Sequence, residues 1–224
     1  MNIAKLKQAN DKQQDALMEL ERRGFLLKTL YDATHELSGL EDTEKMIEIF
    51  LLISMGTLGI TQGFVLKIDT ESLNGQVTSR GLDDRDIRKL HESVPQIINK
   101  YFSGILQKDA PLPMEAHLIV RKGLPDNHFF PHETKVLIKW NIDKKYVGLM
   151  GLKAKILDED YSDEEIEFLL GLSHSLLVSI KNARSTAIIR QLNLDLQQKN
   201  IAQQEALKEE ERTQRRNWTV GFFT

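Results

Sequence analysis

The chain of 224 residues contains no cysteine. It therefore cannot form a disulfide, use a thiolate as a nucleophile or hold a metal through sulfur, and a cytoplasmic location is the default expectation. Residues 1–12 are polar and lack the apolar block of a secretory signal. No apolar run reaches the roughly 18 residues that a membrane-spanning helix needs. A formal net charge of -3 gives no electrostatic reason to expect nucleic-acid binding.

The composition otherwise suits a folded domain. Apolar residues make up 41% of the chain, which is enough for a core, and the length suits one ordinary domain with extensions. Two full domains would be cramped.

The most informative stretch is 135–184, where two strand patterns precede a long helix. Apolar residues alternate along 136–142, as in a half-buried strand. The run 146–152 is apolar on both faces and contains two glycines, which indicates a central strand with close backbone contact. The short polar segment between the two runs completes a predicted antiparallel hairpin.

The start of the following helix carries a capping box, because Ser162 can cap the amide of residue 165 and Glu165 can reach back. Tyr161 and Ile166 occupy the two positions of a hydrophobic staple. The helix then carries two apolar stripes, which predicts that one face packs on a sheet and the neighbouring face packs on another helix, for which a second chain is one source. A helix buried on both faces inside one domain is the alternative. The stripes are Ile166, Leu169, Leu170, Leu177 and Ile180, and Phe168, Leu172, Leu176, Ala183 and Ala187.

Three motifs in this order and spacing resemble the closing strand and last helix of GAF domains. They are Tyr-Val-Gly-Leu-Met-Gly-Leu at 146–152, Tyr-Ser-Asp-Glu-Glu-Ile-Glu-Phe-Leu at 161–169 and Ile-Lys-Asn-Ala-Arg at 180–184. GAF domains are small sensory modules of cytoplasmic signalling proteins. The resemblance implies an α+β fold of the PAS/GAF type, an antiparallel sheet with terminal helices on one face and a ligand pocket on the other.

The first half of the chain predicts the order that opens a GAF domain: helix, helix, strand, turn, strand. Residues 1–38 predict one helix that begins as an exposed, weak coiled coil and ends packed on a domain. A second helix is capped at Asp42 or Thr43 and ends near residues 56–59. Alternating residues 64–68 predict a strand, followed by a turn at Asn74-Gly75 and a short strand around Val77.

The middle of the chain would form the wall of the pocket in a GAF-like fold. Asp83 and Asp84 can start a third helix, which Pro95 should break or bend because proline lacks the amide that an interior turn needs. A short strand is predicted at 116–120. The predicted pocket combines apolar walls with a few polar atoms, and a register error of one residue would move a strand side chain to the other face. Its residues are Phe64, Leu66, Leu118, His128, Phe129, Ile138 and Trp140.

The helical pattern continues beyond residue 184 to about residue 216, and its polar last third needs a partner helix. The resemblance implies a signalling helix that leads to a downstream output domain. The predicted organisation is an N-terminal helix or coiled coil (1–25), a GAF-like sensory domain (26–185), a C-terminal signalling helix or coiled coil (186–216) and an aromatic tail (217–224). A homodimer through both helices is expected. Its predicted contacts are Leu17, Leu20, Leu172, Leu176, Ala183, Ala187, Leu192 and Leu196.

No catalytic group and no metal site is predicted. His128 and His132 are four residues apart, but Pro131 argues against the helix that would bring both imidazoles to one face. His35 resembles the phospho-acceptor of histidine kinases without the accompanying nucleotide site. Neither the Asn-Lys-Phe-Asp/Glu motif of cyclic-nucleotide-binding GAF domains nor a bilin-attaching cysteine is present. The cofactor, if any, is left open.

Two functions of different classes follow from these observations. The first is a non-enzymatic sensory or regulatory module that binds a small ligand or partner and relays the change through dimeric helices. The second is a dimerisation or docking adaptor with a degenerate pocket and no ligand. A haem- or metal-binding sensor is a weaker third hypothesis.

Overall fold

A computed structural model describes residues 3–106, 114–122, 129–143 and 145–221. The chain divides into two compact units, Met1–Lys181 and Asn182–Thr224. The first unit contains the described strands, the shorter helices and the start of the last helix. The elements in chain order are α1 (Ile3–Ser38), α2 (Thr43–Leu58), β1 (Gly63–Asp69), β2 (Asn74–Arg80), α3 (Asp84–Glu92), α4 (Val94–Leu106), β3 (Glu115–Val120), β4 (Val136–Asn141), β5 (Tyr146–Leu152) and α5 (Asp163–Gly221).

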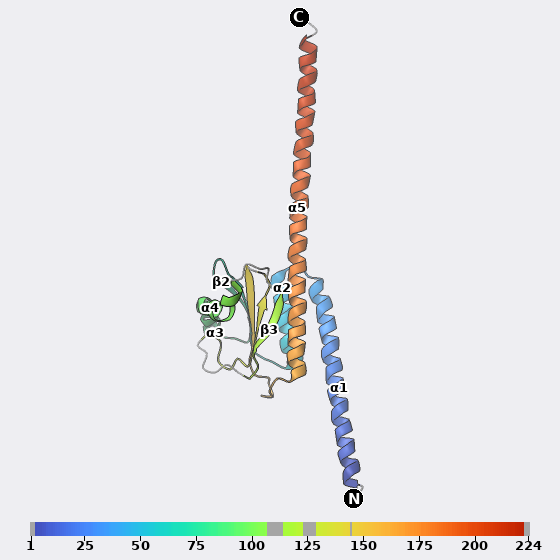
Figure 1. The fold of residues 1–224 in the computed structure, drawn as a ribbon, viewed down its shortest axis with the longest axis vertical. Helices are drawn as coiled ribbons and strands as arrows, with labels where there is room; N and C mark the ends of the chain where they lie inside the picture. The colour runs from blue at the N-terminus through green and yellow to red at the C-terminus, as the bar shows by residue number, and fades with distance from the viewer. Residues whose placement is uncertain (1–2, 107–113, 123–128, 144, 222–224) are drawn as a thin grey trace. The chain divides into compact units, whose positions relative to one another are not determined.

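The strands form one antiparallel sheet in the order β2-β1-β5-β4-β3. The predicted hairpin is confirmed as β4 and β5, and β5 is the central strand that its apolar faces indicated. Figure 1 shows α3 and α4 on one face of the sheet, and α2 with the start of α5 on the other. The sheet therefore has two buried faces.

The face under α3 and α4 is filled by a cluster of buried apolar side chains, which we call the α3/α4-face cluster. Phe64 of β1 stacks on Phe130 with ring centroids 6.1 Å apart, and Tyr101 of α4 lies 5.8 Å from the same ring. The buried members are Phe64, Leu66, Ile68, Leu90, Val94, Ile97, Ile98, Phe102, Phe130, Leu137, Val147 and Leu149.

The opposite face packs against α2 and α5. The rings of Trp140 and of Phe50 from α2 are nearly perpendicular, with centroids 5.2 Å apart. Beside it in β5, a Cβ at Gly148 would lie only 2.9 Å from the Trp140 ring. The glycine therefore gives the indole the room that a larger side chain would take.

The predicted turn at Asn74-Gly75 is wrong. Both residues lie inside β2, where Asn74 pairs with Asp69 and Gly75 with Ile68, and the turn falls at residues 70–73. A Cβ at Gly75 would lie 2.5 Å from the side chain of Val94. The glycine therefore serves the close approach of α4 to the sheet rather than a turn.

The helix boundaries follow their predicted signals. Asp42 caps α2, its side chain accepting a hydrogen bond from the Glu44 amide at 2.9 Å, and Gly59 ends the helix in the left-handed conformation with φ +65°. Asp83 caps α3 in the same way, accepting from the Asp86 amide at 2.7 Å. The predicted break near Pro95 is confirmed, because α3 ends at Glu92 and α4 begins at Val94.

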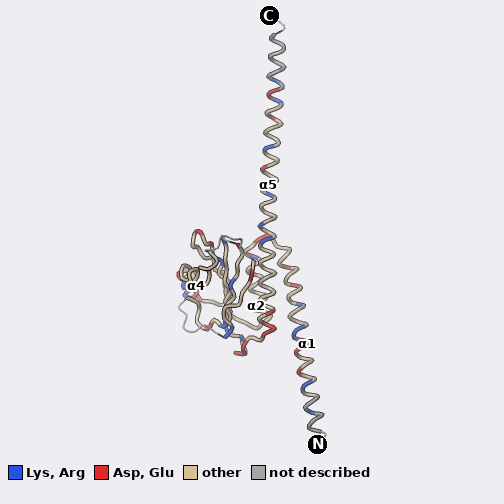
Figure 2. Tube along the Cα trace, viewed as in Figure 1, with Lys and Arg blue, Asp and Glu red and all other residues tan. Residues whose placement is uncertain are grey.

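The second unit consists of the later part of α5, and its side chains from Ala187 to Glu210 are exposed. Both signs of charge are scattered along it, as they are along α1 (Figure 2). No described helix is long and apolar enough to cross a membrane. The large apolar side chains exposed in this unit are Ile188, Ile189, Leu192, Leu194, Leu196, Ile201 and Leu207.

Candidate functional site

The first turn of α5 is held by the predicted capping box, which is confirmed. The Glu165 amide donates to Ser162 Oγ at 3.3 Å, and the Ser162 amide donates to Glu165 Oε2 at 2.7 Å. Each residue thus satisfies a backbone N–H group that the helix itself leaves without a partner.

Glu165 is also the centre of a buried ion cluster. Its side chain is only 3% exposed and accepts hydrogen bonds from Lys155 Nζ at 3.2 and 3.3 Å, and the Lys155 side chain is 7% exposed. Arg22 of α1 donates to Oε1 of the same carboxylate. One carboxylate therefore joins α1, the loop after β5 and the start of α5. We call Arg22, Lys155 and Glu165 the Glu165 cluster.

Arg121 fixes the residue that precedes the cap. Its guanidinium donates to the Tyr161 carbonyl from Nε at 3.0 Å and from Nη2 at 2.7 Å, and it pairs with Asp163. Arg121 directly follows Val120, which packs against the α3/α4-face cluster. The phenol of Tyr161 donates to the Lys153 carbonyl at 2.6 Å, and burial, with a smaller effect from Glu165, raises the pKa of Tyr161.

The helices α1 and α5 lie side by side and parallel within the first unit. Arg23 Nη2 donates to Glu164 Oε1 at 2.9 Å, and the hydroxyls of Thr34 and Ser175 lie 2.9 Å apart. A Cβ at Gly171 would lie 3.2 Å from Leu30 Cδ2. Each of these pairs is separated by 141 positions in the chain. The two helices therefore keep one register over three turns.

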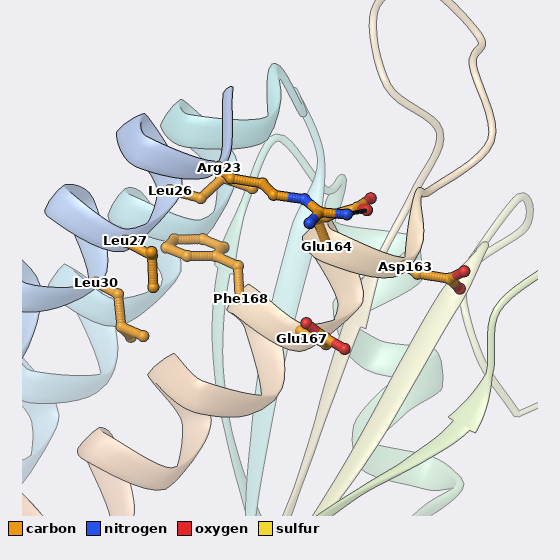
Figure 3. Close-up of a pocket in the computed structure, with 8 residues that line it drawn as sticks. All are labelled: Arg23, Leu26, Leu27, Leu30, Asp163, Glu164, Glu167 and Phe168. Atoms are coloured by element: carbon orange, nitrogen blue, oxygen red, sulfur yellow. Dashed lines mark hydrogen bonds and ion pairs between the residues drawn. The ribbon is translucent and has the colours of Figure 1, made fainter. Parts of the chain in front are cut away.

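A groove of about 500 Å³ lies between these two helices (Figure 3). Its apolar part is made by three leucines of α1 and Phe168, and three carboxylates of α5 stand at its rim. Figure 3 shows Arg23 reaching from α1 to Glu164 beside the Phe168 ring. A hydrogen bond from its own backbone amide, followed by the bond from Arg23, lowers the pKa of Glu164 to about 2. The lining residues are Arg23, Leu26, Leu27, Leu30, Asp163, Glu164, Glu167 and Phe168.

Two apolar stripes of α1 differ in burial. Leu26, Ala33 and Leu37 are buried against the domain. A second stripe, which we call the α1 seam, follows the three-and-four spacing of a coiled coil and stays exposed. Its apolar members, with exposed fractions of 54, 68, 67 and 72%, are Leu17, Leu20, Leu27 and Tyr31.

The residues of the predicted pocket do not share one face. Phe64, Leu66 and Phe129 belong to or pack against the α3/α4-face cluster. Because side chains alternate along a strand, Ile138 and Trp140 point to the opposite face from Leu137, a member of that cluster. Leu118 pairs with Ile138 and is 36% exposed, and His128 lies outside the described residues. Whether any of them lines a ligand site stays a prediction.

The residues of the predicted dimer interface also divide. Leu17 and Leu20 are exposed on α1, and Ala187, Leu192 and Leu196 are exposed in the second unit. Ala183 is half-buried. Leu172 and Leu176 are fully buried inside the first unit, because this stripe of α5 packs within its own domain, so a second chain cannot reach them in this conformation.

The histidine pair offers no ligand set in the described part of the chain. His132 Nδ1 lies 3.9 Å from Glu133, and the His132 side chain is 93% exposed. Among the described residues, no group of three or more His, Asp or Glu side chains is arranged to hold a metal ion.

Sequence reasoning missed the basic residues around the start of α5. Arg22 precedes its carboxylate partner by 143 positions, and Arg121 precedes Asp163 by 42. No local spacing connects residues so distant in the chain. The signals in the sequence that pointed to this place, the capping box and the hydrophobic staple, are both local to the start of the helix.

Comparison with known proteins addresses the fold. No family model and no curated protein matches this sequence. Among solved structures, the chain is similar to the GAF domain of a protein assigned as a sensor histidine kinase from Pseudomonas syringae pv. tomato, with a TM-score of 0.50 and 17% identity over 78% of this chain and 97% of that domain. The GAF domain of a phosphoenolpyruvate-protein phosphotransferase from Coxiella burnetii has a TM-score of 0.49 and 15% identity over 73% and 96%. The first likeness shows that this chain has a GAF-like fold, as predicted.

Proposed function

We propose that the chain is a non-enzymatic regulatory module with a GAF-like fold, in which a change on the α3/α4 face of the sheet is relayed to α1 and α5. In this proposal the helices dimerise and pass the change to a downstream domain or protein.

The observation that carries the proposal is the convergence of basic side chains on the first turn of α5. Arg121 comes from the end of β3, Lys155 from the loop after β5, and Arg22 from α1. Val120 and Arg121 are neighbours in the chain. Val120 packs against the α3/α4-face cluster, and Arg121 donates hydrogen bonds to the Tyr161 carbonyl. A shift of β3 caused by binding on that face would therefore move the start of α5.

Such a relay means that the α3/α4-face cluster and the first turn of α5 are energetically coupled, and this coupling free energy can be measured. Ile97→Val in α4 trims the α3/α4-face cluster at a fully buried site, and a change of this kind costs about 0.5–1.5 kcal/mol. We expect it to speed amide hydrogen exchange in the first turn of α5, at residues 163–166.

Combining Ile97→Val with Arg121→Ala should remove most of that effect, because the connecting side chain is gone. Lys122→Ala, at the exposed neighbouring position, is the matched control and should leave the effect in place. Unchanged exchange at residues 163–166 in the Ile97→Val protein would reject the relay.

A second candidate function has an observation of its own. In the described part of the chain, the face on which a pocket was expected is filled by twelve buried apolar side chains with exposed fractions of at most 6%. This packing favours the adaptor without a small-molecule ligand. A thermal-shift screen against cyclic nucleotides, haem, metal ions and small metabolites separates the two functions. A large ligand-dependent rise in melting temperature excludes the adaptor.

A further inference from the structure

We propose that the groove between α1 and α5 receives a second copy of this chain in parallel, with Lys28 of each copy pairing with Glu167 of the other. The inference rests on the dimeric part of the proposed function and names the surface and the register.

The first reason is that the groove opens beside an apolar stripe that the chain itself leaves exposed. Leu27 belongs to both the groove lining and the α1 seam, and it is 67% exposed. Leu20 and Tyr31 extend the seam on either side by seven and four residues. This spacing is the one by which two helices interdigitate along their length. An identical seam on a second copy supplies the matching surface.

The second reason is the charge of the rim. Asp163, Glu164 and Glu167 stand on the α5 side. Arg23, the basic residue among the described residues that line the groove, is already paired with Glu164 and Glu19. An occupant with basic groups beside an apolar stripe is therefore favoured over an acidic one. Lys28 is exposed and directly follows Leu27 of the seam, so the α1 helix of a second copy meets this requirement.

The third reason is helical geometry. At 3.6 residues per turn, Lys28 points roughly 120–160° away from Arg23, Leu30 and Thr34, the side chains through which α1 meets its own α5. Lys28 therefore faces away from the Glu167 of its own chain. A pairing of these two residues has to be made between chains.

The fourth reason is the level of the two residues along the helices. The constant separation of 141 positions places Lys28 level with Leu169 of α5. Glu167 is two residues before Leu169, which is about 3 Å along a helix axis. A two-fold axis parallel to the helices places each residue at the same height along the axis in both copies. The long side chains of Lys28 in one copy and Glu167 in the other can therefore reach each other. An antiparallel pair has no such match of levels built into it.

The test uses the full chain in sedimentation equilibrium at low salt, with the variants Lys28→Glu and Glu167→Lys and the double variant. A symmetric dimer contains two such pairs, and each single variant turns both attractions into repulsions. We expect each single variant to weaken self-association by roughly tenfold or more, and the double variant to return it to within about threefold of wild type. Lys45→Glu, at an exposed site on α2, is the control and should change little.

The outcomes separate this inference from the function on which it rests. A wild-type dimer that is indifferent to both single variants, or that the double variant does not restore, overturns the Lys28–Glu167 register and leaves dimerisation standing. A wild-type monomer throughout the micromolar range overturns both, and leaves the groove to a helix of another protein.

Discussion

The Glu165 cluster leads to the sharpest stability prediction, because it joins two buried and opposite charges. The Glu165 and Lys155 side chains are 3% and 7% exposed, and their charged atoms lie 3.2 Å apart. Replacing Glu165 by glutamine keeps an oxygen that can accept from the Ser162 amide, but it leaves the buried Lys155 ammonium with only the more exposed carboxylate of Glu159, 3.5 Å away. Breaking a buried ion pair in this way costs about 3–5 kcal/mol of the unfolding free energy.

The assay is urea unfolding followed by circular dichroism at one fixed protein concentration, since dimerisation would make stability depend on concentration. For a unit of this size, the same loss lowers the melting temperature by roughly 6–20 °C. Glu164→Gln is the matched control. It removes a carboxylate from the same helix turn, so the helix dipole acts on both, but its pair with Arg23 is exposed and should contribute much less.

A second variant identifies the cause of the loss. In Glu165→Gln with Lys155→Met neither charge remains, and replacing a buried ion pair by uncharged groups of similar volume is often neutral. We therefore expect most of the lost stability to return. The reasoning is refuted if Glu165→Gln costs no more than Glu164→Gln, or if the double variant is less stable than Glu165→Gln alone.

Three further predictions concern single side chains. The pKa of Glu164 falls from 4.5 to about 2 on folding. The contribution of this carboxylate to the unfolding free energy is therefore complete above pH 4.5 and is lost as the pH falls toward 2. The stability difference between wild type and Glu164→Gln should shrink over that range. A constant difference in pH-dependent urea unfolding would count against this. Burial raises the pKa of Tyr161 above its ordinary value of 10, so folding favours the neutral phenol. Raising the pH through 10 should therefore destabilise wild type more than Tyr161→Phe in the same urea-unfolding assay. Gly151→Ala places a Cβ against the Phe64 ring and should cost about 1–3 kcal/mol, whereas Gly56→Ala, in an open part of α2, should stabilise by about 0.5–1 kcal/mol. Equal melting temperatures for the two glycine variants would show that the Phe64 contact is absent.

The elements that the sequence predicted well are those whose signals lie within a few residues. The capping box at Ser162 and Glu165, the cap at Asp42 and the break near Pro95 each depend on neighbours in the chain, and the structure has all three. The hairpin of β4 and β5 was predictable because alternation and a short polar link occur together.

Features set by tertiary packing were not predictable in this way. The Asn74-Gly75 pair has the sequence of a turn, but Gly75 is needed where Val94 of α4 approaches β2. The second stripe of α5, with Leu172 and Leu176, could have faced a partner, and its burial inside the first unit depends on where α1 and α2 lie.

The candidate site shows the same limit. Alternation placed Ile138 and Trp140 on a common face of β4, but it could not say which face meets α2 and which meets α4. The Glu165 cluster could not be predicted, because Arg22 and its carboxylate partner come together only when α1 and α5 run side by side in register.

The central claim is that these helices act as a parallel dimer, and cross-linking through a single cysteine tests it most directly. The chain has no cysteine of its own, so Leu27→Cys places one thiol per chain on the α1 seam. In a parallel dimer the two copies of position 27 face each other, and mild oxidation should give mostly covalent dimer. Glu48→Cys, exposed on α2, should stay monomeric in denaturing electrophoresis. The absence of a cross-link at position 27, or equal cross-linking at position 48, would contradict the account.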